Sequence, residues 1–141
     1  MLAEGCPGMA VTLDLEKYRE RRNLMLALLE CAAGVIPFAS WVQASESFSN
    51  RKTEKLDLYF KIAYGILEDI LMIWQGSAAL RNRDISGRIS RISEAVNFRW
   101  IEKATGLVDE LAQLVRRNIQ KTIALDAVII ELRNQLQSVR A

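Results

Sequence analysis

The residues in this sequence that could do chemistry are arginines gathered in one stretch between residues 81 and 99. Only Asp84 and Glu94 oppose them there, so this is the most basic cluster in the chain. Guanidinium groups bind phosphates and carboxylates, and such a cluster could contact nucleic acid or an acidic partner. The candidate basic patch consists of Arg81, Arg83, Arg88, Arg91 and Arg99.

The alternative is a solvated helix face whose arginines pair with neighbouring carboxylates, and the sequence favours this interpretation. Phe98 and Trp100 are the aromatic residues interleaved with the arginines, and helical periodicity places both toward the core. The patch would then lack an aromatic platform on which bases could stack. The net charge of +2 gives no separate argument for nucleic acid.

The remaining reactive side chains form no pattern typical of an enzyme or a metal site. The chain has no histidine, its two cysteines form no CxxC motif, and no GxxxxGK[ST] phosphate loop occurs. Carboxylate pairs such as Glu68 and Asp69 are sequential, so they point in different directions around a helix. We expect no catalytic, cofactor-binding or metal-binding residues, and we expect Asp69 to form a structural ion pair with Arg81 or Arg83 if the connector folds back.

Helices must position these residues, because apolar residues recur at steps of three and four and no segment reads convincingly as a strand. Gly34 and Gly76 are placed to end helices, and Asn97 is placed to cap one. The fold class predicted is an all-α bundle of about five to six helices. The expected helices cover residues 7–13, 14–34, 37–49, 54–75, 85–96, 98–117 and 121–139.

Two of these helices, 54–75 and 121–139, carry a second apolar stripe beside the first. The doubled stripes indicate either an oligomer interface or central helices covered on two sides by their own chain, and the sequence does not separate the two. We expect the 54–75 helix to be central. The candidate subunit-interface positions are Tyr59, Ile66, Ile73, Ile123, Ala127 and Ile130.

Length and composition fit one globular domain, with 141 residues of which 50% are hydrophobic and 26% charged. No apolar run approaches the roughly 20 residues that span a bilayer, so we expect no membrane association. Glu4 stands where a signal peptide would carry a cation, which favours a cytoplasmic protein. Cys6 and Cys31 are then expected to be small buried hydrophobes in a reducing compartment.

Five segments, taken in order, carry a resemblance to a known family. The stretch 2–10 (LAEGCPGMA) is similar to a lid-subdomain turn, and 13–22 to the start of the long helix after it. Residues 56–71 and 80–84 (LRNRD) resemble a central collar helix and its Asn-containing loop, and 116–132 resembles a collar ending. The combination resembles the C-terminal collar of bacterial AAA+ clamp-loader subunits of DNA polymerase III, above all their delta prime branch.

This resemblance implies that residues 1–13 are a remnant of the AAA+ lid and that residues 14–141 form a helical collar, or oligomerisation, domain. Collars associate side by side into a ring, so the implied partners are the other clamp-loader subunits, gamma/tau and delta. Contacts with DNA and the sliding clamp would belong to the part of the parent that precedes Leu2. Met9 stands where nucleotide-responsive relatives carry a sensor arginine, which favours a non-hydrolysing subunit.

Two other interpretations remain open at this level. The chain could be the collar of the gamma/tau ATPase subunit, which a phosphate loop in the parent protein would reveal. It could also be a small helical DNA-binding module that uses the Arg81 to Arg99 patch, in which case binding should weaken steeply with salt.

Overall fold

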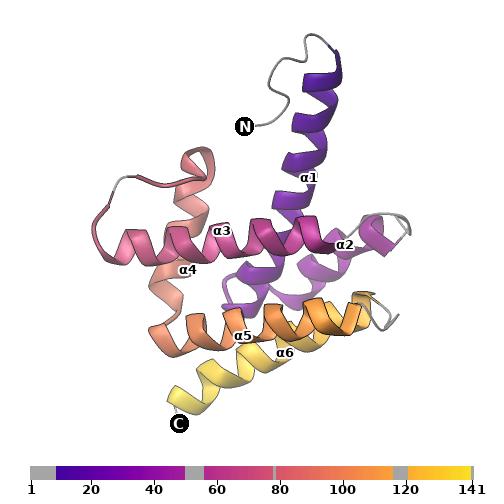
Figure 1. Ribbon diagram of the computed structural model, residues 1–141. Helices are drawn as coiled ribbons and strands as arrows, with labels where there is room; N and C mark the ends of the chain where they lie inside the picture. Colours follow the sequence, from indigo (N-terminus) through magenta and orange to yellow (C-terminus); the bar gives the residue numbers. More distant parts are fainter. Residues whose placement is uncertain (1–8, 50–55, 78, 116–120, 141) are drawn as a thin grey trace.

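The computed structural model describes residues 9–49, 56–77, 79–115 and 121–140, and within these ranges all regular secondary structure is helical (Figure 1). This confirms the predicted all-α bundle. The described part contains six α-helices and one short 3-10 helix. They are α1 (Met9–Ala32), α2 (Phe38–Ser49), α3 (Leu56–Trp74), η1 (Arg83–Ile85), α4 (Ser86–Ala95), α5 (Phe98–Val115) and α6 (Lys121–Arg140).

Two helices end where the sequence predicts, at glycines with left-handed backbone. Gly34 after α1 has φ of 78° and Gly76 after α3 has φ of 76°, a conformation that favours glycine because it has no Cβ. The amide of Val35 donates to the carbonyl of Glu30 at 2.9 Å, which satisfies a carbonyl that the helix end would leave open. These turns reverse the chain into α2 and into the connector that leads to η1.

The start of the chain differs from the prediction. α1 runs from Met9 to Ala32 without a break, so the expected separate helix ending near Leu13 and the expected cap at Asp14 are wrong. No glycine or proline interrupts this stretch, and an aspartate inside a helix costs only a fraction of a kcal/mol in propensity. Cys6, Pro7 and the segment 116–120 lie outside the described residues.

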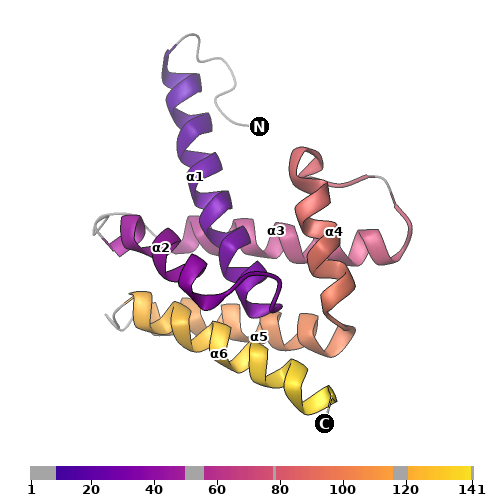
Figure 2. The same cartoon turned by 180° about the vertical axis from the view of Figure 1, so that it is seen from behind.

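The C-terminal half of α1 occupies the middle of the molecule. Every residue from Leu24 to Ala33 is buried, and this helix packs against α2, α3, α4 and α6. The N-terminal half projects beyond the bundle, as both Figure 1 and Figure 2 show. α3, which the sequence predicts to be central, packs against α1, α4 and α5 and shares the core with α1.

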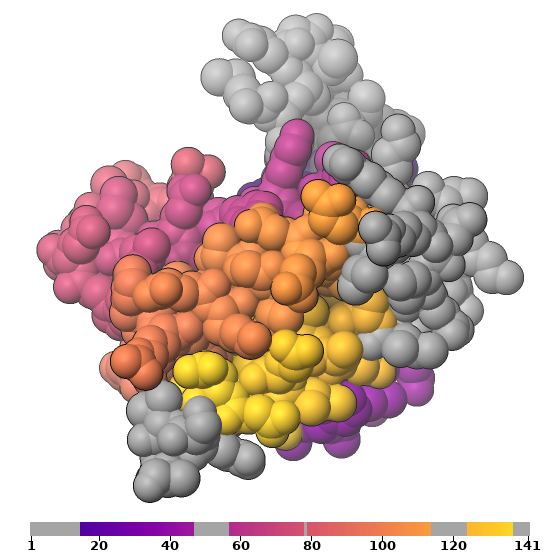
Figure 3. Space-filling view, turned by 60° about the horizontal axis from the view of Figure 1, so that its bottom comes forward, coloured from indigo at the N-terminus to yellow at the C-terminus, as the bar shows by residue number. Residues whose placement is uncertain are grey.

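α5 and α6 form one face of the bundle, where they run side by side (Figure 3). Their inner sides pack on α3 and α1, respectively. Two fully buried tryptophans tie these helices to the rest through their indole N–H groups. Trp41 donates to Asp126 Oδ1 at 2.7 Å, and Trp100 donates to the carbonyl of Ala32 at 3.4 Å. None of the helices in the described part is both long and apolar enough to traverse a lipid bilayer.

Candidate functional site

The α5–α6 face is set in place by the N-terminus of α5. Asn97 Oδ1 accepts a hydrogen bond from the amide of Trp100 at 2.9 Å, which is the capping role that the sequence predicts. The indole of Trp100 then fills the core under α1, and this fixes the rotation of α5 about its axis. The outer side of α5 carries charged residues, and one edge of α5 packs against α6.

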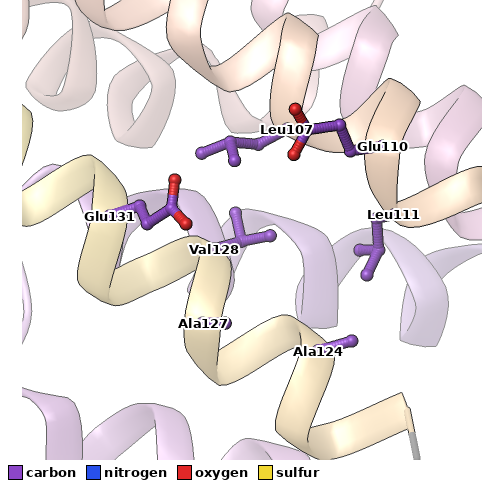
Figure 4. Close-up of a pocket in the computed structure, with 7 residues that line it drawn as sticks. All are labelled: Leu107, Glu110, Leu111, Ala124, Ala127, Val128 and Glu131. Atoms are coloured by element: carbon purple, nitrogen blue, oxygen red, sulfur yellow. The ribbon is translucent and has the colours of Figure 1, made fainter. Parts of the chain in front are cut away.

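A shallow groove lies between α5 and α6, and we take it as the candidate site (Figure 4). Leu107 of α5 and Val128 of α6 point toward one another across it, and the carboxylates of Glu110 and Glu131 flank its opening. Its volume is about 80 Å³. The α5–α6 groove is lined by Leu107, Glu110, Leu111, Ala124, Ala127, Val128 and Glu131.

The candidate interface positions on α6 lie beside this groove or on the outer side of the same helix. Ala127 lines the groove and is exposed. Ile130, one turn further along, is 52% exposed, so a large apolar side chain lies on the surface beside Ala127. Ile123 belongs to α6, but its side chain lies outside the described part. Ala127 and Ile130 therefore remain as the candidate interface positions on the outer surface of α6.

The candidate positions on α3 differ from the expectation. Tyr59 is 1% exposed and Ile66 0% exposed, so this chain already buries both, and the structure removes them from the candidate interface. Ile73 is half-buried and packs against the core. The second stripe of α3 is covered because α3 lies between α1, α4 and α5, which is the alternative that the sequence left open.

The charged residues among those described that line the groove are both acidic, Glu110 and Glu131. The Lys103 ammonium lies 3.6 Å from Glu131 Oε2, with both side chains about half exposed, and Glu110 forms no ion pair with any described residue. On the neighbouring surface the Tyr64 hydroxyl donates to Asp109. Desolvation and this hydrogen bond together raise the pKa of Tyr64 to about 12, so the phenol stays neutral.

Two arginines of the basic patch are bound to carboxylates of this chain. Arg81 Nη2 lies 2.9 Å from Glu68 Oε2 in an exposed pair. Arg88 approaches Glu30 with both Nη2, at 2.6 Å, and Nε, at 3.3 Å, and Glu30 is buried. Arg88 therefore compensates a buried charge, which is a structural role.

The other three arginines of the patch, Arg83, Arg91 and Arg99, are exposed and form no ion pair within the described ranges. They do not form one compact cluster, because η1 and the start of α5 lie at opposite ends of α4, which is about 15 Å long (Figure 1). The predicted placement of Phe98 toward the core is wrong, because its side chain is 60% exposed. Trp100 is buried as predicted.

The connector between α3 and η1 folds back onto α3 through Asp69. Its carboxylate is 1% exposed and accepts three hydrogen bonds, from the amide of Arg81 at 2.9 Å, the amide of Asn82 at 3.0 Å and Asn82 Nδ2 at 2.8 Å. The sequence correctly predicts that Asp69 contacts Arg81, but the predicted interaction, an ion pair, is wrong. The contact is made by backbone and amide N–H groups rather than by a guanidinium.

Arg22 binds the same connector from α1. Its guanidinium, in a side chain that is almost fully buried, donates to Asp84 at 2.9 Å and 2.5 Å and stacks over Tyr18 at 5.7 Å. The hydrogen bonds from Arg22 hold the pKa of Asp84 below its ordinary value. We call Arg22, Asp69, Asn82 and Asp84 the polar cluster, and it joins α1, α3 and η1.

Sequence reasoning missed three of the buried or capping charges. Arg22 stands on an otherwise apolar face of α1 and Glu30 stands inside an apolar run, which are the signals that could have found them. Arg133 closes the C-terminal end of α1, where its Nε donates to the carbonyl of Cys31 at 2.8 Å and its Nη2 to that of Ile36 at 3.1 Å. Burial raises the pKa of the Cys31 thiol, and this cysteine is fully buried as predicted.

Across the part of the chain that the structure describes, no three His, Cys, Asp or Glu side chains lie close enough together to hold a metal ion. The buried carboxylates all have partners within the fold, as the contacts of Glu30 and Asp69 show. What the surface offers is an apolar groove with acidic edges and an exposed isoleucine next to it. Comparison of this chain with protein-family models, with curated proteins and with solved structures gives no match.

Proposed function

We propose that this chain is a helical oligomerisation domain that holds the subunits of a larger assembly together. The observation that carries the proposal is the α6 outer surface, where Ile130 is 52% exposed beside the apolar α5–α6 groove. Contiguous exposed apolar surface marks protein contacts more often than isolated apolar side chains do.

The resemblance to clamp-loader collars specifies the assembly. In this proposal the chain is the collar of a delta prime type subunit of DNA polymerase III and holds the clamp-loader ring together, so that the sliding clamp can be loaded during DNA replication. Its partners are the gamma/tau and delta subunits, and it carries out no catalysis itself. A gamma/tau collar is the alternative within the same family, and the parent sequence distinguishes the two by its phosphate loop.

Apolar burial would supply the energy of such a contact. Covering a fully exposed isoleucine contributes about 1.5–3 kcal/mol, and Ile130 starts half covered, so its share is about 1 kcal/mol. Association costs several kcal/mol in lost freedom. A stable contact therefore needs the groove and its rim as well as Ile130.

A second candidate function is the binding of a polyanion, and the observation that favours it is the exposed aromatic ring of Phe98 next to Arg99. A ring and a guanidinium can stack on bases and contact phosphates. The ion pairs of Arg81 and Arg88 leave fewer free cations than the sequence indicates. Binding of single-stranded DNA measured across salt tests this candidate, and the absence of binding at low salt removes it.

Native mass spectrometry tests the oligomerisation proposal. The chain would be measured alone and mixed with the collar domains of the other clamp-loader subunits from the same organism, and we expect a defined hetero-oligomer. Ile130→Asp should prevent it while thermal unfolding followed by circular dichroism stays unchanged, because the side chain is exposed. Val42→Asp, which places the same charge at a 42% exposed site on α2, is the matched control and should assemble normally.

A monomer in every mixture would refute the proposal. So would unaltered assembly of the Ile130→Asp chain. If that variant unfolds instead, Ile130 contributes to the core and the assignment of the α6 surface fails.

A further inference from the structure

The chemistry of the α5–α6 groove specifies the kind of partner that fits it. Its floor is made of side chains without polar groups, two from α5 and two from α6, namely Leu107, Leu111, Ala124 and Val128. A volume of about 80 Å³ is several times what one water molecule requires. Water gains no hydrogen bonds from an apolar floor, so an aliphatic side chain is the better occupant.

The small residue at position 127 gives access to this floor from the α6 side. Ala127 lines the groove and is exposed, so a second backbone can approach there without meeting a long side chain. A groove between two adjacent helices matches the ridge of a third helix, whose side chains at i and i+4 project in one row. An amphipathic helix is therefore the shape that the groove accepts.

The charged residues at the edge of the groove, which we call its rim, indicate which charge the partner helix should carry. Glu110 and Glu131 flank the opening from opposite helices, and the neighbouring cation, Lys103, approaches Glu131 only at 3.6 Å on the surface. An acidic helix would place like charges against this rim, whereas lysine or arginine would pair with it. Glu110 forms no ion pair with a described residue, and its side chain is exposed at the groove.

We infer that the α5–α6 groove binds a basic amphipathic helix of a partner subunit, which inserts an aliphatic side chain between Leu107 and Val128 and sets Lys or Arg side chains against Glu110 and Glu131. The inference rests on the proposed function, since it names the partner of the same surface. It adds a specificity that apolar burial does not supply. Partners with acidic flanks are rejected even when their apolar residues fit.

A displayed library of helical peptides tests this inference against the full 141-residue chain. Each peptide would carry leucine at i and i+4, with Lys, Glu or Gln varied at the flanking positions. We expect selection to enrich lysine there, and we expect the selected peptide to shift the amide resonances of α5 and α6. Enrichment of glutamate or glutamine, or shifts confined to other helices, would overturn the inference.

Variants of the chain separate the contributions of floor and rim. Glu110→Gln with Glu131→Gln should weaken binding of the selected peptide about three- to tenfold, the size expected for two exposed ion pairs. Ala127→Phe should abolish binding by filling the groove, without unfolding the chain. Glu94→Gln with Glu102→Gln removes two exposed carboxylates that do not line the groove, and these should leave binding unchanged.

The two proposals fail in different ways. If the hetero-oligomer forms and requires Ile130 but tolerates the Glu110 and Glu131 variants, the inferred basic partner is wrong and the oligomerisation proposal stands. If the basic peptide binds the groove while no hetero-oligomer forms, the groove accepts basic helices and the proposed assembly is wrong. Self-association that the Glu110 and Glu131 variants abolish would identify a second copy as occupant, which also contradicts the inference.

Discussion

Asp69 gives the sharpest test of how the connector after α3 is held. Its buried carboxylate receives two N–H groups of Asn82, both buried, and the half-buried amide of Arg81. Asp69→Ala removes the acceptor and leaves these donors without a partner. Each unsatisfied buried donor costs about 1–3 kcal/mol, and the amide of Arg81 costs less because water can reach it. The sum predicts a loss of about 3 kcal/mol or more in the free energy of unfolding.

The assay is urea unfolding followed by circular dichroism, combined with hydrogen exchange at the amides of Arg81 and Asn82, which should lose their protection. Glu68→Ala is the matched control, since it removes the adjacent carboxylate, whose ion pair with Arg81 is exposed. That change should cost less than about 1 kcal/mol. If Asp69→Ala costs no more than Glu68→Ala, the hydrogen bonds of Asp69 do not hold the connector and the reasoning is wrong.

Two further predictions concern charges that the structure pairs. Arg88→Met leaves the buried carboxylate of Glu30 without its cation and should cost about 1–3 kcal/mol, whereas Arg91→Met, one turn along the same helix, should change stability by less than about 0.5 kcal/mol in the same urea assay. Equal costs would contradict the structural role of Arg88. The lowered pKa of Asp84 means that its ion pair stabilises the fold at pH above about 5 and that this contribution disappears as the pH falls through the folded-state pKa. The stability difference between the native chain and Asp84→Asn should therefore shrink from pH 5 toward pH 2, and a constant difference would refute the assignment.

The elements of the fold follow closely from local signals. Apolar spacing predicts all the described α-helices from residue 37 onward, and glycines 34 and 76 and Asn97 act at the ends where the sequence places them. These signals are local, since a positive φ or a cap depends on the residue and its immediate neighbours. The break expected near Asp14 is the exception, because a capping residue is compatible with a helix interior when nothing else interrupts the helix.

Local signals could not predict which apolar stripes are covered by a neighbouring helix and which remain exposed. Periodicity shows that Tyr59 and Ile130 both extend an apolar arc, but it does not show which neighbouring helix packs on that arc. The structure buries Tyr59 beneath its own chain and leaves Ile130 exposed. Phe98 follows the same rule, since it is 60% exposed although Trp100, in the same turn of α5, is fully buried. Such outcomes depend on tertiary arrangement, which one sequence leaves open.

The positions of the polar cluster and of the groove separate stability from binding in this chain. The polar cluster joins α1, α3 and η1, and the Glu30–Arg88 pair joins α1 to α4, so these two sets of charges lie away from the α5–α6 groove. The groove is formed by packed aliphatic side chains, and its carboxylates Glu110 and Glu131 support no buried group. Changes at the groove rim can thus alter partner choice at little cost to folding. Changes at Asp69 should reduce stability before they affect any partner, which makes the two classes of variant mutual controls.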